Sequence, residues 1–505
     1  MMSNTPGANG SPKLLDLDKV KIDPAVALLV SPTLALRRQV LPFARHNGFA
    51  QVACANPHDT HTLHVVERQL QMPVRAEQAE PESLKRALQR VYGSPQAAAS
   101  GNALRANSID RALEELESEG AVALGQELLH AAILRQASDI HIDVEKDGVV
   151  VRFRVDGVLE TYRKLPPSAH SPLISRLKVL CGMDIAEKRA PQDGGFRHTY
   201  GPQGQSVDIR AATLPTKYGE RMTLRLLALQ AERLTLEQLG MSPAHLTLFE
   251  QMLDRPHGLI LLTGPTGSGK STTLYASLRR LTERESLNIV TVEDPIEYEI
   301  PGVAQVEVDS ADKVSFSKAL RSILRHDPDV VMIGEIRDTE TAGIAIKAAL
   351  TGHLVFSTLH TNNAVGVVTR LADMGIERYL IGASLRLAVA QRLVRRLCPH
   401  CREPHALSDR EAASLGRPEL AGLAVHRAVG CAYCGGKGYY GRVGLFELLP
   451  LDETMSRRIA DGAEEPELVA MMRQRQIGSL LDDAVEKLRS GTTTVSEVLS
   501  AVTVW

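Results

Sequence analysis

The alternation of apolar and polar positions is clearest in the middle of the chain. Four short apolar runs, at Leu259–Leu262, Asn288–Val292, Val330–Ile333 and Leu354–Thr358, alternate there with stretches of helical periodicity. Short apolar runs separated by helices are typical of parallel strands joined by crossover helices. The pattern therefore predicts an α/β domain with a parallel sheet over residues 231–395.

A second pattern precedes this region. Residues 108–136 have helical periodicity, and stretches of alternating apolar and polar residues follow them. These stretches are Ile140–Val144, Val149–Val155 and Ser206–Ala211. Asp156 and Gly157, directly after the second, have the chemistry of a tight turn. We therefore expect a long helix followed by half-buried strands, which together form a second α/β domain over residues 108–230.

The first part of the chain mixes shorter patterns. Apolar runs such as Ala25–Val30 predict strands, and stretches such as Glu82–Val91 predict helices, which suits a small α/β unit. Residues 93–101 are mainly small residues and proline, typical of a linker. The predicted divisions are a first domain at 1–95, a linker at 96–107, a second domain at 108–230, a core at 231–395, a cysteine-containing segment at 396–442 and a helical part at 443–505.

Composition limits the class of protein. A chain of 505 residues with 44% hydrophobic residues is expected to form about three domains, each with its own core. The net charge of −2 gives no overall basic field, so it does not support nucleic acid or lipid head groups as major partners. The first residues lack a signal-peptide pattern, and no run approaches the roughly 18 apolar residues of a membrane span. We therefore expect a cytoplasmic protein that reaches a membrane through a protein partner.

A glycine-rich loop follows the first of the four apolar runs. Residues 264–272 read GPTGSGKST, which has the Walker A spacing of a phosphate-binding loop. In such loops backbone N–H groups surround the phosphates, the lysine reaches the β and γ oxygens, and the serine hydroxyl helps to hold Mg²⁺. The predicted nucleotide-binding residues are Gly264, Pro265, Thr266, Gly267, Ser268, Gly269, Lys270, Ser271 and Thr272, with Ser271 as the magnesium ligand.

Acids and histidines stand at the ends of the other three runs. The second run leads into Glu293, the third has the Walker B shape and leads into Glu335, and the fourth lies between His353 and His360. Because the carboxyl ends of parallel strands meet at one edge of a sheet, we expect these side chains to converge on the phosphate loop. A carboxylate at that edge can orient water or hold Mg²⁺, and a histidine can sense the γ-phosphate.

The six cysteines fall into two groups. Cys54 and Cys181 stand alone and are expected to be small buried residues. The other four form two CxxC pairs, Cys398 with Cys401 and Cys431 with Cys434, separated by residues 402–430. In a reducing compartment, tetrahedral thiolate ligation of Zn²⁺ explains this spacing better than disulfides or a redox pair. Four thiolates fill the coordination shell, so the predicted zinc is structural.

The order of the motifs resembles that of the secretion ATPases. GPTGSGKSTTLYA, VEDPIE, DPDVVMIGEIRD and TGHLVFSTLHTN are similar to the Walker A, Asp, Walker B and His boxes of that family. The second domain is similar as well, at ASDIHI, VRFRVDG and DIRAATLPT. The chain most resembles the motors of type II secretion systems, and the type IV pilus extension motors share the same boxes.

The resemblance implies a fold class and a set of roles. The expected fold comprises a small α/β docking domain, a PAS-like second domain and a RecA-like P-loop ATPase domain with a tetracysteine zinc segment and a helical C-terminus. The implied enzyme is a Mg²⁺-dependent ATPase in a ring of six subunits that energises protein export by pseudopilus assembly. Glu293 would position the attacking water, Glu335 would hold the Mg²⁺ shell, and His360 would report the phosphate state.

The resemblance also implies that cations from the second domain complete the ATP site. The matching positions are Arg210 and Arg225, since a planar guanidinium stabilises the negative charge of phosphoryl transfer. Further arginines without an assigned role are Arg221, Arg321, Arg325 and Arg337.

The first domain would bind an inner-membrane platform protein, which would bring the chain to the inner face of the bacterial inner membrane. Three alternatives remain: a pilus extension ATPase, a nucleic-acid motor of the same fold, and a ring component without turnover. A nucleic-acid motor needs aromatic stacking platforms, and aromatic residues make up 4% of this chain. We therefore expect no nucleic-acid partner. Because Glu293 and Glu335 are both present, we expect ATP turnover.

Overall fold

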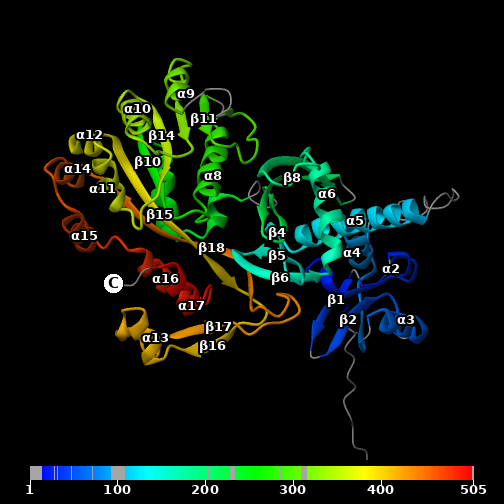
Figure 1. Cartoon of the computed structure of the whole chain (residues 1–505). Coiled ribbons are helices and arrows are strands. Elements are labelled where there is room, and N and C mark those ends of the chain that lie inside the picture. Colours follow the sequence, from blue (N-terminus) through cyan, green and yellow to red (C-terminus); the bar gives the residue numbers. More distant parts are fainter. Residues whose placement is uncertain are drawn as a thin grey trace, which may run out of the picture. The chain divides into compact units, whose positions relative to one another are not determined.

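The computed structural model describes residues 14–27, 29–30, 32–46, 48–57, 59–70, 72–92, 109–201, 204–227, 234–284, 286–308 and 316–502. The predicted linker at 96–107 lies outside the described residues. The chain forms two compact units (Figure 1). Unit 1 comprises Met1–Leu229, Cys398–Cys401 and Val429–Gly438, and unit 2 comprises Gln230–Leu397, Arg402–Ala428 and Tyr439–Trp505. Each unit is described by itself.

Unit 1 begins with a three-stranded sheet of order β1-β2-β3, in which β1 and β2 are antiparallel and β2 and β3 parallel. The strands are β1 (Val40–His46), β2 (Phe49–Cys54) and β3 (Val74–Gln78). The helices are α1 (Pro24–Ala27), α2 (Pro32–Arg38), α3 (Thr60–Leu70) and α4 (Pro81–Tyr92). Helix α4 confirms the helix predicted at Glu82–Val91.

The strand predicted at Ala25–Val30 is wrong, because the chain forms helix α1 there. Pro24 occupies the first helical position, where its fixed φ favours a helix and its missing N–H costs nothing. Val26, Ala27 and Val30 are each fully buried in the core of this domain. The run is therefore apolar because its residues are buried in the core of the domain, although they do not belong to the sheet.

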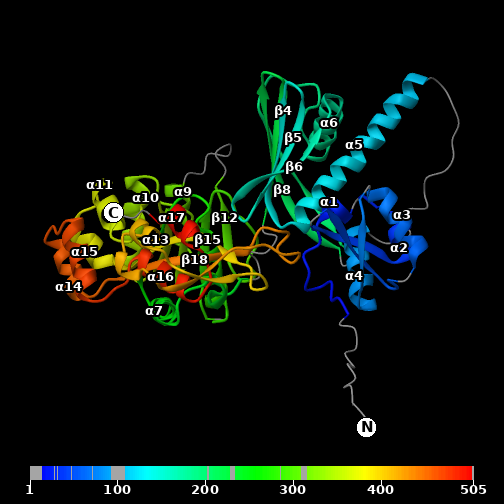
Figure 2. The ribbon, with the colours of Figure 1, turned by 90° about the horizontal axis from the view of Figure 1, so that it is seen from below.

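The rest of unit 1 is built on a six-stranded antiparallel sheet of order β6-β5-β4-β9-β8-β7. Its strands are β4 (Ala137–Glu145), β5 (Gly148–Val155), β6 (Val158–Leu165), β7 (Gln192–Tyr200), β8 (Gln205–Thr216) and β9 (Gly219–Leu226). Helices α5 (Ile109–Leu134) and α6 (His170–Leu180) lie beside it (Figure 2). The predicted turn is present, with φ of 51° at Asp156 and 85° at Gly157.

One face of this sheet is apolar and the other is polar. Ile140, Phe153 and Ile209 point to the buried face and pack with Leu128 of α5 and Leu177 of α6. The alternate residues of the same strands are largely charged. The predicted helix and strands of this region are confirmed, whereas β6, β7 and β9 were not predicted.

Unit 2 is built on a seven-stranded sheet of order β12-β11-β13-β14-β10-β15-β18, parallel except for β18. The strands are β10 (Gly258–Thr263), β11 (Ile289–Glu293), β12 (Ala304–Glu307), β13 (Val330–Ile333), β14 (Leu354–Leu359), β15 (Leu385–Leu397) and β18 (Tyr439–Pro450). Successive residues of β10 enter two different cores, Leu259 and Leu261 on one face and Ile260 and Leu262 on the other. Burial on both faces explains why the parallel strands read as continuous apolar runs.

Helices cover this sheet and continue to the end of the described chain. They are α7 (Pro243–Leu253), α8 (Lys270–Thr282), α9 (Phe316–Ile323), α10 (Thr339–Leu350), α11 (Gly366–Asp373), α12 (Arg378–Ser384), α14 (Glu453–Ala460), α15 (Glu465–Gln474), α16 (Leu480–Arg489) and α17 (Val495–Ala501). A separate hairpin of β16 (Glu403–Ala406) and β17 (Ala424–Arg427) encloses α13 (Asp409–Ser414). Across the described part of the chain, no helix has both the length and the apolar composition that crossing a membrane requires.

Candidate nucleotide and metal sites

The backbone of the phosphate loop requires its glycines. Gly264, Gly267 and Gly269 have φ of 148°, 78° and 92°, which residues with a side chain rarely adopt. A Cβ on Gly264 would lie 2.4 Å from the carbonyl oxygen of Gln391, and one on Gly269 would lie 2.7 Å from the Nε2 atom of Gln391. The loop therefore packs tightly against β15, and helix α8 starts directly behind it at Lys270.

Lys270 is enclosed by its own loop. Its side-chain ammonium donates to the carbonyl oxygens of Gly264 at 2.7 Å and Pro265 at 3.1 Å, and the residue is 8% exposed. Burial lowers the pKa of Lys270 to about 8, with Arg392 acting in the same direction and Glu335 against it. The ammonium, the loop N–H groups and the start of α8 together form an anion-binding environment, which fits the phosphates of ATP.

The strand order brings the predicted residues to one edge of the sheet. Strands β11, β13, β14 and β10 are consecutive neighbours and parallel, so their carboxyl ends lie side by side. Glu335 follows β13, and its Oε2 atom lies 3.4 Å from Nε2 of His360, which follows β14. Its other oxygen pairs with Arg337. Lys270, Glu335 and His360, predicted from separate motifs, thus lie at the same edge of the sheet.

Glu293 lies at the same edge but is 3% exposed. Its carboxylate accepts hydrogen bonds from the hydroxyl of Tyr275, from Oγ1 of Thr291 at 2.6 Å and from Nε2 of Gln305 at 3.1 Å. Burial, followed by the contact with Glu293, raises the pKa of Tyr275. The Glu293 carboxylate therefore ties β11 to α8 and β12. Within the same segment, Glu297 is exposed.

The two predicted arginines lie opposite each other in unit 1. Arg210 of β8 is the register partner of Arg225 of β9, and Arg225 is in turn the register partner of Asp139 on β4. Nε of Arg225 lies 3.0 Å from Oδ1 of Asp139, and Nε of Arg154 lies 3.7 Å from its Oδ2. Arg221 instead pairs with Asp143, Nε to Oδ1 at 2.8 Å.

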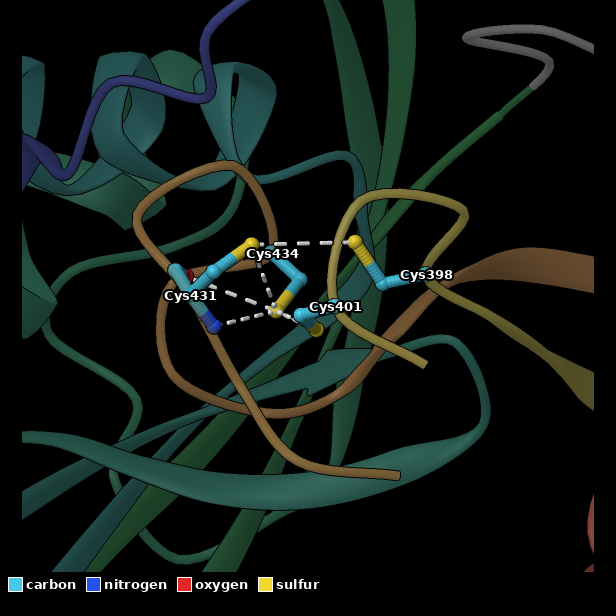
Figure 3. A group of neighbouring side chains, drawn as sticks. All are labelled: Cys398, Cys401, Cys431 and Cys434. Atoms are coloured by element: carbon cyan, nitrogen blue, oxygen red, sulfur yellow. Dashed lines mark hydrogen bonds between the residues drawn. The ribbon is translucent and has the colours of Figure 1, made fainter. Parts of the chain in front are cut away.

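The four paired cysteines gather in unit 1, and their side chains point toward one another (Figure 3). All four sulfur atoms lie within 4.8 Å of one another, and Cys398–Cys431, Cys401–Cys434 and Cys431–Cys434 are each separated by 3.8 Å. Tetrahedral zinc with Zn–S bonds of about 2.3 Å requires sulfur separations of about 3.8 Å. The backbone N–H of Gly438 donates to Sγ of Cys434 at 3.1 Å. The cluster therefore fits a tetrahedral metal ion, while Cys54 and Cys181 are buried elsewhere, as predicted.

The sequence profile described as type II/IV secretion system protein matches residues 114–500, which is more than half of the chain. The chain belongs to this family. A second profile, the MshEN domain, matches residues 11–98 of this chain.

Individual relatives agree with the profile. The type II secretion system protein E of Pseudomonas aeruginosa is 49% identical over 387 residues, covering 77% of this chain and 76% of the relative. That of Klebsiella pneumoniae is 43% identical over 489 residues, covering 92% and 97%. The type IV pilus assembly ATPase PilB of Thermus thermophilus is 37% identical over 491 residues, covering 95% and 55%.

Two solved structures share the fold. The pilus retraction motor PilT with bound ADP is 27% identical, with a TM-score of 0.51 over 74% of this chain and 95% of that one. The ATPase DotB of Legionella pneumophila has a TM-score of 0.55 at 23% identity, covering 74% and 94%.

These matches confirm the predicted family, the α/β fold class and the main functional prediction, a secretion ATPase of the type II system. The pilus assembly ATPase is a related protein of lower identity.

Sequence reasoning missed two residues of this secretion ATPase beside the phosphate loop. Gln391 of β15 is 1% exposed and accepts a hydrogen bond from Oγ1 of Thr273 at 2.9 Å. Arg392 donates through Nη2 to the carbonyl oxygen of Asn362 at 2.8 Å. The signal was present as two polar residues directly after the apolar run Leu387–Ala390, but no phosphate-loop motif refers to that strand.

Proposed function

We propose that this secretion ATPase binds ATP at the carboxyl edge of the unit 2 sheet and hydrolyses it with Mg²⁺ to drive protein export. The observation that carries the proposal is the meeting of the phosphate loop with Glu335 and His360, which follow adjacent strands. The PilT relative with bound ADP supports a nucleotide at the matching loop.

Each residue of the edge has a separate task. The loop N–H groups and Lys270 bind the phosphates, and the Ser271 hydroxyl and Glu335 would hold Mg²⁺. When bound, Mg²⁺ supplies charge neutralisation at the β and γ oxygens. His360 contacts Glu335 and would therefore respond to changes at the γ-phosphate. Glu293 remains our candidate for positioning the attacking water. Because its carboxylate already accepts three internal hydrogen bonds, the exposed Glu297 is the residue to compare it with.

The direct test is ATP turnover by the purified full-length chain with Mg²⁺ and with excess EDTA. Turnover that requires Mg²⁺ is expected. A chain that binds ATP but releases no phosphate with Mg²⁺ or Mn²⁺ would contradict the proposal and favour a ring component without turnover.

We further propose a ring of six subunits in which Arg210 and Arg225 contact the γ-phosphate. The two exposed side chains lie on neighbouring strands in register, which places them together on the polar face of the sheet and supports this proposal. A planar guanidinium matches the equatorial oxygens of a transferring phosphoryl group.

For the other sites, we propose Zn²⁺ in the four-cysteine cluster and a platform-docking role for the MshEN domain. The sulfur spacing supports zinc, and the MshEN match supports a separate amino-terminal module. Docking would recruit a cytoplasmic motor to the inner face of the inner membrane. The test is binding of the full chain to the cytoplasmic domain of a type II platform protein and of a pilus platform protein. Selective binding to the second would contradict the secretion assignment.

A further inference from the structure

A buried carboxylate on β18 in unit 2 connects two other parts of the chain. Glu447 is 5% exposed. Its Oε1 atom accepts a hydrogen bond from the backbone N–H of Ala364 at 2.7 Å, and its Oε2 atom accepts one from the N–H of Leu480 at 3.1 Å. Ala364 belongs to the loop that follows His360, and Leu480 is the first residue of α16. One side chain therefore joins the edge of the ATP site to a C-terminal helix.

Arg392 lies against the phosphate loop. A Cβ on Gly264 would lie 2.9 Å from Nη1 of Arg392, so the guanidinium lies against the first glycine of the loop. Its Nη2 atom binds the carbonyl oxygen of Asn362, in the same loop that Glu447 holds at Ala364. Arg392 thus contacts both the phosphate loop and the loop that follows His360.

The charges of the two side chains act on each other and on Lys270. Burial lowers the pKa of Arg392, and the Glu447 carboxylate opposes that change. Burial raises the pKa of Glu447, and the two N–H donors and Arg392 oppose it. Arg392 also lowers the pKa of Lys270. A phosphate bound beside Lys270 would therefore compete with Glu447 for the same guanidinium.

Helix α16 is attached to β18 close to Glu447, so a movement of Glu447 would reach it. Asp483, one turn into the helix, accepts a hydrogen bond from the backbone N–H of Phe446 at 2.8 Å and pairs with Lys487 at 2.5 Å. The start of α16 is thus fixed to β18 at two adjacent residues, Phe446 and Glu447, and a shift of Glu447 would be felt at Leu480 first.

We propose that Arg392 and Glu447 are positioning residues that couple the phosphate loop to the first turn of α16. Bound nucleotide draws the Arg392 guanidinium toward the phosphates, and Glu447 passes the change to Ala364 and Leu480. The coupling rests on the proposed ATP site, because it needs a nucleotide at that loop.

Hydrogen exchange of the full chain, with and without Mg²⁺ and ADP, tests the coupling at separate places. In the wild type, nucleotide is expected to slow exchange in residues 264–272 and also to change it at Ala364 and Leu480. In Glu447→Gln the side-chain amide offers one acceptor in place of two. Exchange at one of the two amides should rise by about tenfold, the effect of losing one hydrogen bond to a charged group, and Leu480 should no longer respond to nucleotide.

Variants of Arg392 distinguish a coupling role from a purely structural role. Arg392→Gln is expected to abolish the nucleotide response at Ala364 and Leu480 while residues 264–272 still respond. Arg392→Lys, which keeps the positive charge, should restore the response at both amides. Arg396→Gln, on the same strand but exposed, is the matched control and should leave all these responses unchanged.

The outcomes distinguish the two proposals. If residues 264–272 respond to nucleotide in the wild type while Leu480 does not, the coupling is wrong and the ATP site stands. If residues 264–272 do not respond either, the proposed function fails and the coupling fails with it. An unchanged nucleotide response at Leu480 in Arg392→Gln would also overturn the role of Arg392.

Discussion

Lys270 shows how one residue prepares the site for an anion. Its ammonium is removed from water and held by two carbonyl oxygens, which carry only partial charges. The protonated form is therefore poorly compensated until a phosphate arrives, and the lowered pKa records that imbalance. The loop therefore leaves the Lys270 ammonium without a full counter-charge, which a bound phosphate would supply.

This imbalance predicts opposite pH effects on binding and on stability. Nucleotide affinity should fall as pH rises through about 8, because Lys270 loses its proton. Between pH 8 and 10.5 the unfolded chain holds more protons at this residue than the folded chain, so its contribution to the free energy of unfolding should rise with pH. Titration calorimetry and denaturant unfolding across this range check both, with Lys270→Met as the control that flattens each profile.

Substitution of Lys270 and Glu335 should separate binding from chemistry. Lys270→Ala is expected to weaken ATP binding by roughly 10- to 100-fold, because it removes a charged contact. Glu335→Gln should leave affinity within about tenfold but lower turnover by at least about 100-fold, since the Mg²⁺ shell loses its charge. Equilibrium binding and phosphate release measure the two. An unchanged turnover number in Glu335→Gln would remove Glu335 from the mechanism.

Glu293 and Glu297 give a paired prediction about water positioning. If Glu293 acts on water, Glu293→Gln lowers turnover far more than Glu297→Gln does. If its three hydrogen bonds make it a structural residue, Glu293→Gln mainly lowers the melting temperature, and Glu297→Gln lowers turnover. Tyr275→Phe removes one of the three donors and serves as the control for stability. Phosphate release and thermal unfolding of the three variants decide between the roles.

At the scale of elements, the predictability of each strand follows from its burial. Strands β10, β11, β13 and β14 were predicted because both faces of each are covered, so almost every residue is apolar. Strand β15 was missed because its second half carries Arg392, Arg395 and Arg396. Those charges are tolerated because Arg392 meets the loop after β14 and Arg395 pairs with Glu497 of α17. Partners so distant in sequence leave no local pattern.

The same reasoning applies to the site. Glycine and lysine spacing predicted the phosphate loop, and strand ends predicted Glu335 and His360, since both depend on local sequence. Gln391, Arg392 and Glu447 could not be predicted, because their roles arise from strands that meet only in the folded sheet.

The cysteine cluster carries the prediction for metal removal. Beside it, Ala432 packs against the core of the first domain, and Nζ of Lys437 lies 2.5 Å from Oε2 of Glu160. Chelation should therefore loosen the segment Val429–Gly438 and lower the melting temperature by at least about 5 °C, if a few kcal/mol are lost. Differential scanning calorimetry measures this. In Cys401→Ser/Cys431→Ser the chelator should have no further effect, and equal melting of wild type with and without chelator would contradict a structural metal.

At the scale of the whole molecule, the proposed catalytic groups are divided between the two units. Arg210→Gln/Arg225→Gln is expected to lower turnover by at least about 100-fold while ATP affinity changes by less than about tenfold, because guanidinium groups act mainly on the transition state. Arg197→Gln, an exposed arginine of the same sheet paired with Asp208, is the control. Equal loss of turnover in the control variant would show that the sheet, not the two arginines, is affected.

Unit 1 is assembled from distant parts of the chain, since it includes Cys398–Cys401 and Val429–Gly438 as well as residues up to Leu229. During synthesis, its first 229 residues emerge 209 residues (438 minus 229) before the last residue of its final segment, Gly438. At about 5 to 20 residues per second, that interval is about 10 to 40 s. The surface that Ala432 covers is therefore exposed on the ribosome while unit 2 is being made, and a fragment ending near residue 229 would keep it exposed permanently.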